Sequence, residues 1–464
     1  MAAIITDVFK TKLLQRIFTD VSNDSDKFYI GIGKSEQWDS AENVPTPTDT
    51  PRTIRQVRSA LQSVKKTNDV TFTIPRYNWT PGTYNAYDDN FASIPSNSYY
   101  VLTEDNQVYI CLQQSKDSNG NANTSTVKPT GTATKPFKTS DGYVWKFLYA
   151  LSAIRSSKFL SSNFVPVEKI LDSSELGRTL TTTEQTQDAV QNAASPGQII
   201  GIEMINNGAG YTGSTVAVTV NGDGTGAAAT GTVSGGSVVK IELDSSTDSC
   251  LKFGHGYNFA SITVANPASG TNVATARAVF GPDSGMGADP RNELKSTSLM
   301  FNAKPNGTES TTQAVSGDTT AGSSFIIDQD FRQVAIMRDL KDSAGVNLFT
   351  GTSGKILKYL NFTTVPTFPK DAIITGAGGG QAVVDTVDSS RVWFHQNDST
   401  GFKSFIAGET VSGGGTSATL DSANGFLKNG DVDKLSGEIL YIENRAPVVR
   451  AANQTEDIKV VITL

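Results

Sequence analysis

The chain is poor in the residues that build metal and redox sites. Its 464 residues include two cysteines, Cys111 and Cys250, and two histidines, His255 and His395. Two cysteines so far apart give neither a disulfide framework nor a zinc cluster, and two histidines are too few for a histidine-rich metal site. We therefore expect no metal and no cofactor, and we expect synthesis in the cytosol.

Long apolar runs and blocks of basic residues are also missing. No run reaches the roughly 18 apolar residues of a membrane-spanning helix, and the first residues lack the continuous apolar segment of a signal peptide. The 39 basic and 46 acidic residues give a net charge of -7, and no basic block stands out, which argues against a nucleic-acid binder. We expect neither a membrane nor a nucleic acid as a partner.

What the sequence has in abundance is glycine, 42 residues of it, together with Thr, Ser, Val and Asn. This composition is typical of a mainly β protein with many tight turns. At the start of the chain Ile5, Phe9, Leu13 and Ile17 fall four apart, which predicts one amphipathic helix that packs on its own domain or on a neighbour. "YYVLT" and "QVYICL", joined by residues 104–106, predict a β-hairpin. Asp289 followed by Pro290 predicts a helix start.

A second glycine-rich feature is an internal repeat. "GAGY" begins at Gly208 and "GHGY" at Gly254, an offset of 254 − 208 = 46, and "GTGAAATGTV" and "GTNVATARAV" begin 46 residues apart as well. "GQIIGIEM" and "GSVVKIEL" begin 39 residues apart, at Gly197 and Gly236. Two copies of one β unit are expected to stack and share a core.

The domain organisation follows from these changes of composition. The predicted segments are a core segment 1–194, a two-copy Gly-rich β-repeat module 195–285, a core continuation 286–349, a second Gly-rich β insertion 350–430 and C-terminal core strands 431–464.

The stretch "GKS" at residues 33–35 has the last three residues of a phosphate-binding P-loop. The P-loop motif has two glycines five residues apart. Gly33 matches the second, but this chain has Phe28 at the position of the first. A helix must also follow directly, whereas Pro45, Pro47 and Pro51 predict an extended loop. We therefore interpret the match as chance and predict that the chain binds no nucleotide.

Other catalytic patterns are equally unspecific. Asp141 near "GYVW", and the pair Glu438 and Glu443, are carboxylates of the kind that any chain with 46 acids offers. The aromatic residues Trp79, Tyr84 and their neighbours could form a sugar platform, but such residues more often fill a core or an interface. The residues alone indicate a mainly β, non-enzymatic structural or binding protein.

Six stretches, taken together and in order, resemble the gene-8 baseplate wedge protein of T4-like contractile-tailed phages. They are "GKSE" with Trp38, "IPRYNW" (74–79), "VYICL" (108–112), "DGYVWKFLYAL" (from 141), "FRQVAIM" (from 331) and the closing segment 436–464. The two Gly-rich inserts depart from that family and look like small β repeats in virion proteins of marine T4-like phages.

The resemblance implies β-sandwich domains and no catalytic activity. It implies a homodimer within each wedge, in contact with the gene-10, gene-7, gene-6 and gene-53 type products, in the tail baseplate of a virion assembled in the host cytoplasm. The family-like residues that we single out as possible interface are Gly33, Lys34, Ser35, Glu36, Trp38, Pro75, Arg76, Trp79, Trp145, Phe331, Arg332, Gln333, Glu443, Asn444 and Arg445.

Dimer interfaces favour aromatic residues and arginine, so we look for interface residues among Trp38, Trp79, Tyr84, Trp145, Tyr441 and Arg445, with ordinary core positions as the alternative. The polar residues Glu443, Asn444 and Arg445 lie beside Pro447 and either fix a loop or meet a partner. For Trp145 and Tyr441, inside alternating strands, a core position is the better interpretation. Two alternatives to the wedge remain: a receptor- or glycan-binding adhesin-like tail protein with exposed repeats, and a tail-associated glycosidase or peptidase.

Overall fold

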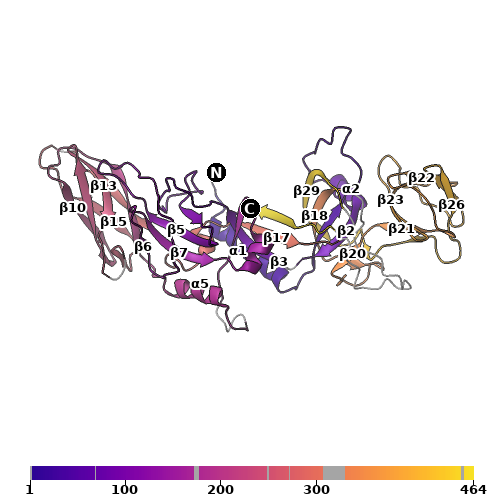
Figure 1. The fold of residues 1–464 in the computed structure, drawn as a ribbon, viewed down its shortest axis with the longest axis horizontal. Coiled ribbons are helices and arrows are strands. Elements are labelled where there is room, and N and C mark those ends of the chain that lie inside the picture. Colours follow the sequence, from indigo (N-terminus) through magenta and orange to yellow (C-terminus); the bar gives the residue numbers. More distant parts are fainter. Residues whose placement is uncertain are drawn as a thin grey trace. The chain divides into compact units, whose positions relative to one another are not determined.

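A computed structural model describes residues 3–67, 69–171, 177–247, 250–270, 272–306, 330–450 and 454–464. The fold is mainly β, as predicted, with 39% strand and 11% helix. By their contacts the residues divide into unit 1, Met1–Gln15, Thr71–Met300 and Val461–Leu464, and unit 2, Arg16–Val70 and Phe301–Val460. Figure 1 labels the elements of both.

The chain passes from one unit to the other within four elements. These are α1 (Asp7–Ser22), β3 (Asp69–Pro75), β17 (Ser298–Ala303) and β30 (Ile458–Thr463). The three strands form a sheet with β8 (Phe164–Val167) in the order β30-β17-β3-β8. Helix α1 confirms the helix predicted from the spacing of Ile5, Phe9, Leu13 and Ile17.

A four-stranded sheet carries the aromatic core of unit 1. Its order is β4-β5-β7-β6, with β4 (Tyr100–Leu102), β5 (Gln107–Gln113), β6 (Phe137–Lys138) and β7 (Val144–Ala150). Strands β4 and β5 form the predicted hairpin. Trp145 is fully buried, with the rings of Tyr84 and Tyr143 at 5.6 and 5.8 Å.

Three short helices complete this part of unit 1. They are α3 (Ala153–Phe159), α5 (Thr182–Asn192) and α6 (Pro290–Glu293). Helix α5 begins with a capping box in which Thr181 and Glu184 bind each other's backbone amides. Asp289 caps α6 and Pro290 opens it, as predicted, although the helix is only four residues long.

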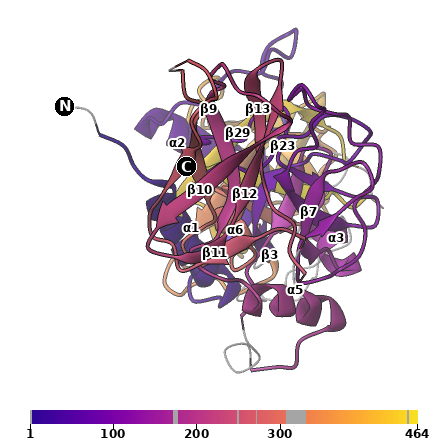
Figure 2. The ribbon, with the colours of Figure 1, turned by 90° about the vertical axis from the view of Figure 1, so that its left-hand side faces the viewer.

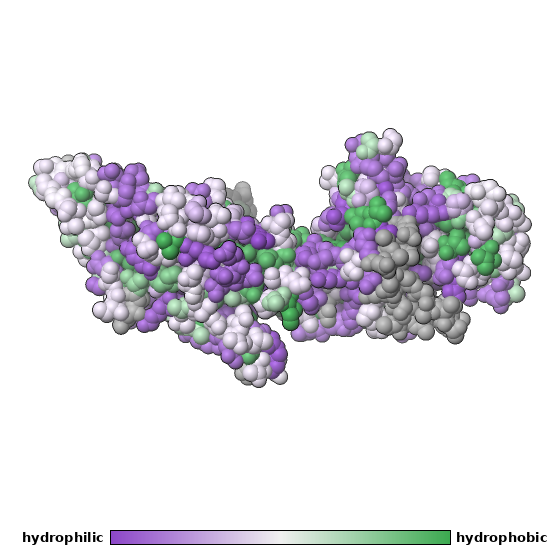
Figure 3. Space-filling view, viewed as in Figure 1, coloured by the Kyte–Doolittle hydropathy of each residue, from purple (hydrophilic) through white to green (hydrophobic). Residues whose placement is uncertain are grey.

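The repeat region of unit 1 forms small antiparallel sheets, and Figure 2 faces several of its strands. The pairings are β13-β12-β10-β15, β11-β14 and β16-β9. The strands are β9 (Ile199–Asn206), β10 (Thr215–Gly222), β11 (Thr225–Ala227), β12 (Ala229–Ser234), β13 (Ser237–Leu243), β14 (Phe253–His255), β15 (Ala260–Val264) and β16 (Thr275–Phe280). All of them lie inside the predicted module 195–285, whose surface is mostly pale to purple in Figure 3.

The two copies of the repeat pair around a pseudo-twofold axis. In the antiparallel pair β10 and β15, Val218 stands opposite Val264, which is its own equivalent because 264 − 218 = 46. The flanking strands cross over: β9 of the first copy pairs with β16 of the second, and β13 of the second pairs with β12 of the first. The two copies therefore complete each other's sheets, which confirms that they share one structure.

Glycines make this exchange possible at two equivalent turns. A Cβ on Gly208 would lie 2.5 Å from the amide nitrogen of Ala274, and one on Gly254 would lie 2.5 Å from that of Ala227. Both glycines also have a positive φ, +62° and +64°. Each copy thus needs glycine at a point where the backbone of the other copy passes close by.

Unit 2 contains a five-stranded sheet and a larger one. The first has the order β20-β2-β1-β18-β29, and it encloses buried side chains that include Tyr29, Val64 and Met337. Its strands are β1 (Phe28–Gly33), β2 (Leu61–Lys66), β18 (Phe331–Arg338), β20 (Ser353–Lys355) and β29 (Glu438–Val448). Two short strands, β19 (Lys341–Asp342) and β28 (Val432–Asp433), pair beside it.

Helix α2 (Pro51–Ala60) precedes β2 in this unit. It was not predicted, and the extended loop predicted through Pro51 ends there. Thr50 caps the helix and Pro51 occupies its first turn, a position where proline loses no hydrogen bond.

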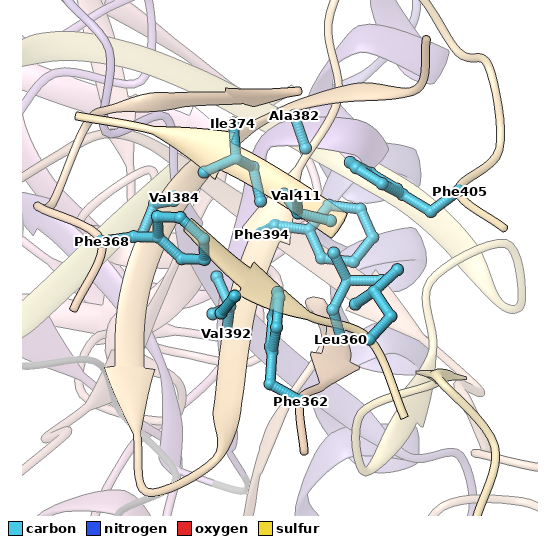
Figure 4. Packing of buried hydrophobic residues seen from close by; sticks show 12 residues of the cluster. Leu360, Phe362, Phe368, Ile374, Ala382, Val384, Val392, Phe394, Phe405 and Val411 are labelled. Carbon is cyan, nitrogen blue, oxygen red and sulfur yellow. The ribbon is translucent and has the colours of Figure 1, made fainter. Parts of the chain in front are cut away.

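The second Gly-rich insertion corresponds to the seven-stranded sheet β26-β25-β22-β23-β24-β21-β27. Phe362, Phe368, Phe394 and Phe405 converge in its core (Figure 4). The strands are β21 (Lys358–Asn361), β22 (Ile373–Gly376), β23 (Gln381–Asp388), β24 (Arg391–His395), β25 (Thr410–Gly413), β26 (Thr416–Thr419) and β27 (Leu427–Lys428). The division of the chain into five segments stays a prediction.

We predict that Gly208→Ala and Gly254→Ala destabilise unit 1 by similar amounts, about 2 kcal/mol or more each, because each adds a backbone clash to an unfavourable φ. Gly235→Ala is the matched control, since Gly235 has a φ of +58° but open space around it, and we expect a cost of about 1 kcal/mol. Differential scanning calorimetry of the full chain measures all three. Equal effects of Gly208→Ala and Gly235→Ala would contradict the close crossing of the two copies.

Candidate functional site

Strand register brings three distant stretches of family-like residues together in unit 2. Gly33 at the end of β1 stands opposite Gln333 of β18, and Gln333 stands opposite Asn444 of β29. Gln333 Nε2 donates to Asn444 Oδ1 at 2.9 Å. The stretches 33–38, 331–333 and 443–445 therefore meet at one end of the sheet, and we call these residues the motif cluster.

Close packing explains the glycine of the false P-loop. A Cβ on Gly33 would lie 2.4 Å from the carbonyl oxygen of Ala60 and 2.5 Å from the Cα of Leu61. The next residue, Lys34, has a φ of +66° and donates its amide to the Ala60 carbonyl at 2.9 Å. Gly33 therefore fits against the end of α2, and the conformation at Lys34 turns the chain out of the sheet.

Arg332 fixes the loop that follows. Its guanidinium is buried and donates to both carboxylate oxygens of Glu42, with Nε–Oε2 at 2.9 Å and NH2–Oε1 at 2.6 Å. It also donates to the carbonyl oxygen of Ser35. The hydrogen bond from Arg332 lowers the pKa of the Glu42 carboxyl. Bidentate pairs of this kind set geometry as well as charge, so this arginine holds residues 35–42 against β18.

Two further hydrogen bonds attach the loop to β29. Trp38 Nε1 donates to the carbonyl oxygen of Arg445 at 2.9 Å, and Asn444 Nδ2 donates to the carbonyl oxygen of Pro45 at 2.8 Å. Trp38, Asn444 and Arg445 were predicted as possible interface residues. The structure assigns the Trp38 indole and the Asn444 amide to contacts inside unit 2.

A buried histidine links the motif cluster to the seven-stranded sheet. His395 Nδ1 lies 2.6 Å from Asp385 Oδ2, and His395 Nε2 lies 2.6 Å from Glu36 Oε1. We call these three residues the ionic clamp. Lys34 Nζ binds the other oxygen of Glu36 at 2.7 Å, and Ser35 Oγ donates to Asp385 Oδ1 at 3.3 Å. The clamp thus joins β23 and β24 to the residues after β1.

The two carboxylates hold His395 in its protonated form. Burial alone would lower the pKa of the ring, but Asp385 and Glu36 outweigh it and raise the pKa to about 10. Burial would raise the pKa of Glu36, yet the hydrogen bonds and charges of His395 and Lys34 hold it well below its usual range. At neutral pH the clamp is therefore an imidazolium between carboxylates.

The residue types of the clamp include those of a hydrolase triad, but the connections differ. In a triad the histidine takes the proton of the serine hydroxyl while the carboxylate orients the ring. Here both ring nitrogens contact carboxylates, and Ser35 binds Asp385 rather than the histidine. The arrangement therefore positions two segments of chain and does not place the histidine as a general base for Ser35.

A cavity of about 840 Å³ lies beside the clamp. Its lining includes Glu36, Trp38 and His395, together with Arg52 and Arg55 of α2. Cavities of this size are typical of ligand or segment binding, so it is the candidate binding site of unit 2.

The remaining predicted residues do not join the motif cluster. Pro75, Arg76, Trp79 and Trp145 belong to unit 1. Arg76 NH1 donates to the carbonyl oxygen of Ser161 at 2.7 Å. Trp79 packs against the core cluster that contains Trp145. Trp145 is a core residue, as the better interpretation had it.

The sequence analysis missed His395 and Asp385 as partners of the family-like residues. It placed His395 within a Gly-rich insert and assigned it no contact with Glu36, which is 359 residues away. The available signal was a histidine next to the apolar run "VWF" in a strand, a setting in which a buried imidazole needs partners.

Two comparisons with known proteins found no match for the chain. Neither a protein-family model nor a curated protein matches it. Among the described residues, no group of three or more His, Cys, Asp or Glu side chains is placed to hold a metal ion. None of the described helices combines the length and the apolar character that crossing a membrane requires.

We predict that His395→Gln destabilises unit 2 by about 3 to 5 kcal/mol near pH 6, because it leaves the buried carboxylate of Asp385 without its cation. The pKa of His395 is raised from 6.5 to about 10, so its stabilisation is complete below pH 6.5 and is lost as the pH rises towards 10. The pKa of Glu36 is lowered from 4.5, so its share is lost only below pH 4.5. Calorimetry of wild type and variant between pH 5 and 10.5 measures the difference.

Arg52→Gln is the control for this experiment. Arg52 pairs with Asp398 at 2.8 Å, but its side chain is 77% exposed, and exposed pairs contribute less than about 1 kcal/mol. A difference between wild type and His395→Gln that stays constant up to pH 10.5 would contradict a charged histidine in the clamp.

A second buried carboxyl lies in unit 1. Glu293 Oε1 accepts the amides of Gly287 and Asp289 at 2.6 and 3.1 Å, while Oε2 is buried and has no hydrogen-bond partner in the described part of the chain. Burial raises the pKa of Glu293 to about 7, although these two amides and Lys146 oppose the rise.

We predict that Glu293 makes unit 1 less stable as the pH rises from about 4.5 to 7. The native state holds a proton there that the unfolded chain has already lost, so stability falls with pH. Glu293→Gln keeps an acceptor for the amides of Gly287 and Asp289 and removes the titration. The variant is expected to lose this pH dependence in calorimetry, and an unchanged pH profile would refute the assignment.

Proposed function

We propose that this chain is a structural subunit of the baseplate wedge of a contractile phage tail. The observation that carries the proposal is the motif cluster. Stretches that resemble the gene-8 wedge family at residues 33–38, 331–333 and 443–445 are far apart in sequence, yet they pair in one register and hydrogen-bond to one another. Chance matches have no reason to converge in this way.

The chemistry of the cluster supports a structural role. Two buried polar groups, Arg332 in the cluster and His395 beside it, are occupied by carboxylates of the same unit. A subunit that ties neighbours together while an assembly changes shape needs its loops fixed, and such bonds fix the loop after β1. In this proposal the chain forms a homodimer in each wedge and contacts the gene-10, gene-7, gene-6 and gene-53 type subunits.

The oligomeric state gives the first prediction of this proposal. Light scattering of the purified full chain is expected to give a dimer of 2 × 49.3 = 98.6 kDa. Cross-linking mass spectrometry on intact particles is then expected to show links from the chain to itself and to other baseplate subunits.

The alternatives predict different results in the same experiments. An adhesin-like tail protein would be a trimer of 3 × 49.3 = 147.9 kDa with links only to fibre or host-surface proteins. Either of these outcomes, or hydrolase activity lost on replacing a single carboxylate, would overturn the wedge proposal.

A further inference from the structure

Helix α1 carries apolar side chains on two opposite faces. One face is buried: Leu14 is fully buried, and beside it Thr11 Oγ1 donates to the carbonyl oxygen of Ser296 at 3.5 Å. Arg291 NH1 also donates to Gln15 Oε1 of the helix. These contacts attach the first half of the helix to the α6 region of unit 1.

The other face is apolar and exposed. Val8, Phe9 and Leu13 are 61%, 59% and 46% exposed, and Ile4 and Ile5, just before the helix, are more exposed still. At about 100° per residue, Leu14 and Thr11 lie about 140° to 200° around the helix from Phe9. Phe9 and Leu13 therefore lie on a separate face that the attached face does not cover, and Val8 lies at its edge, about 20° from Gln15. Exposed apolar side chains grouped in this way mark an interaction surface.

The stripe also carries positive charge. Lys12 and Arg16 are exposed and lie between Val8 and Leu13 around the helix. The one acidic residue between positions 4 and 16 is Asp7, which falls on the side of Leu14. The acid on the stripe side of the helix is Asp20, about 20° from Phe9, and it pairs with Arg16 at 3.1 Å. The Arg16 side chain is 77% exposed, so this contact has little energy and a partner can replace it.

We propose that the exposed stripe of α1, residues 4, 5, 8, 9 and 13 with Lys12 and Arg16, docks in an apolar groove of another protein whose rim carries Asp or Glu. Amphipathic helices bind such grooves through anchors spaced three and four residues apart. Carboxylates at the rim would meet Lys12 and Arg16, and that pairing sets both register and partner choice.

The charges argue against the two other occupants. Two copies of the stripe packed together would bring four cations, Lys12 and Arg16 of both chains, into one interface against two acids, the Asp20 side chains that already pair with Arg16. A membrane surface accepts cations on the polar side of a helix, whereas Lys12 and Arg16 lie within the apolar stripe and would enter the acyl region with it.

The test places a photo-cross-linker on the stripe of the full chain. Phe9→p-benzoylphenylalanine is irradiated in the assembled native particles, beside Ile205→p-benzoylphenylalanine as the control, since Ile205 is an equally exposed apolar residue of unit 1 outside α1. We expect position 9 to link to one other protein, at a peptide that combines apolar residues with Asp or Glu. Adding Lys12→Glu and Arg16→Glu is expected to lower the yield about tenfold.

Several outcomes would overturn the inference. They are links from position 9 to a second copy of the chain, a yield no higher than that of position 205, and a yield insensitive to the charge reversals. Flotation of the protein with phosphatidylglycerol vesicles, lost in Phe9→Ser, would do so as well. Circular dichroism checks that the variants keep their fold. A linked partner outside any baseplate would leave this inference standing while contradicting the wedge proposal.

Discussion

The protonated His395 is the contact on which the organisation of unit 2 depends. Its ring contacts the carboxylate of Asp385 in the preceding strand and the carboxylate of Glu36, which follows β1. Lys34 balances the second negative charge through its contact with Glu36, so removing His395 leaves the buried carboxylate of Asp385 without a cation. The loop 34–42, the seven-stranded sheet and the cavity beside α2 are therefore coupled through one ring.

The repeat region of unit 1 is stabilised by different interactions. It contains few charges in its core and relies on backbone pairing between its two copies, with Val218 opposite Val264 at the axis. Close crossings at Gly208 and Gly254 require the absence of a side chain. Buried charges connect segments in unit 2, whereas strand pairing between two equivalent copies connects them in the repeat region. In both cases the connected residues are distant in sequence.

Local signals in the sequence predicted local structure well. The spacing of Ile5, Phe9 and Leu13 gave α1, the turn at residues 104–106 gave a hairpin, and Asp289 with Pro290 gave a helix start. Helix α2 was missed because Pro51 was grouped with Pro45 and Pro47, although Thr50 before it is a capping residue. The repeat offset identified equivalent residues but carried no information on which strands pair.

The candidate site was predictable only in part. The family-like stretches supplied most of the motif cluster, and the register of β1, β18 and β29 that unites them is a property of the folded sheet. His395 and Asp385 lay outside those stretches, and their contacts with Glu36 and Ser35, respectively, span more than 300 residues. Only the folded chain shows that the imidazole of His395 lies between the carboxylates of Asp385 and Glu36.

The pairing of β9 with β16 has a consequence for how the repeat region is attached. These are its first and last strands, and Gly201 stands opposite Val279, so the chain enters and leaves the region through neighbouring positions about 5 Å apart. A segment with such a narrow base can be gained, lost or exchanged as one cassette while the flanking residues keep their places. The two copies complete each other's sheets, so loss of one copy alone would leave unpaired strand edges.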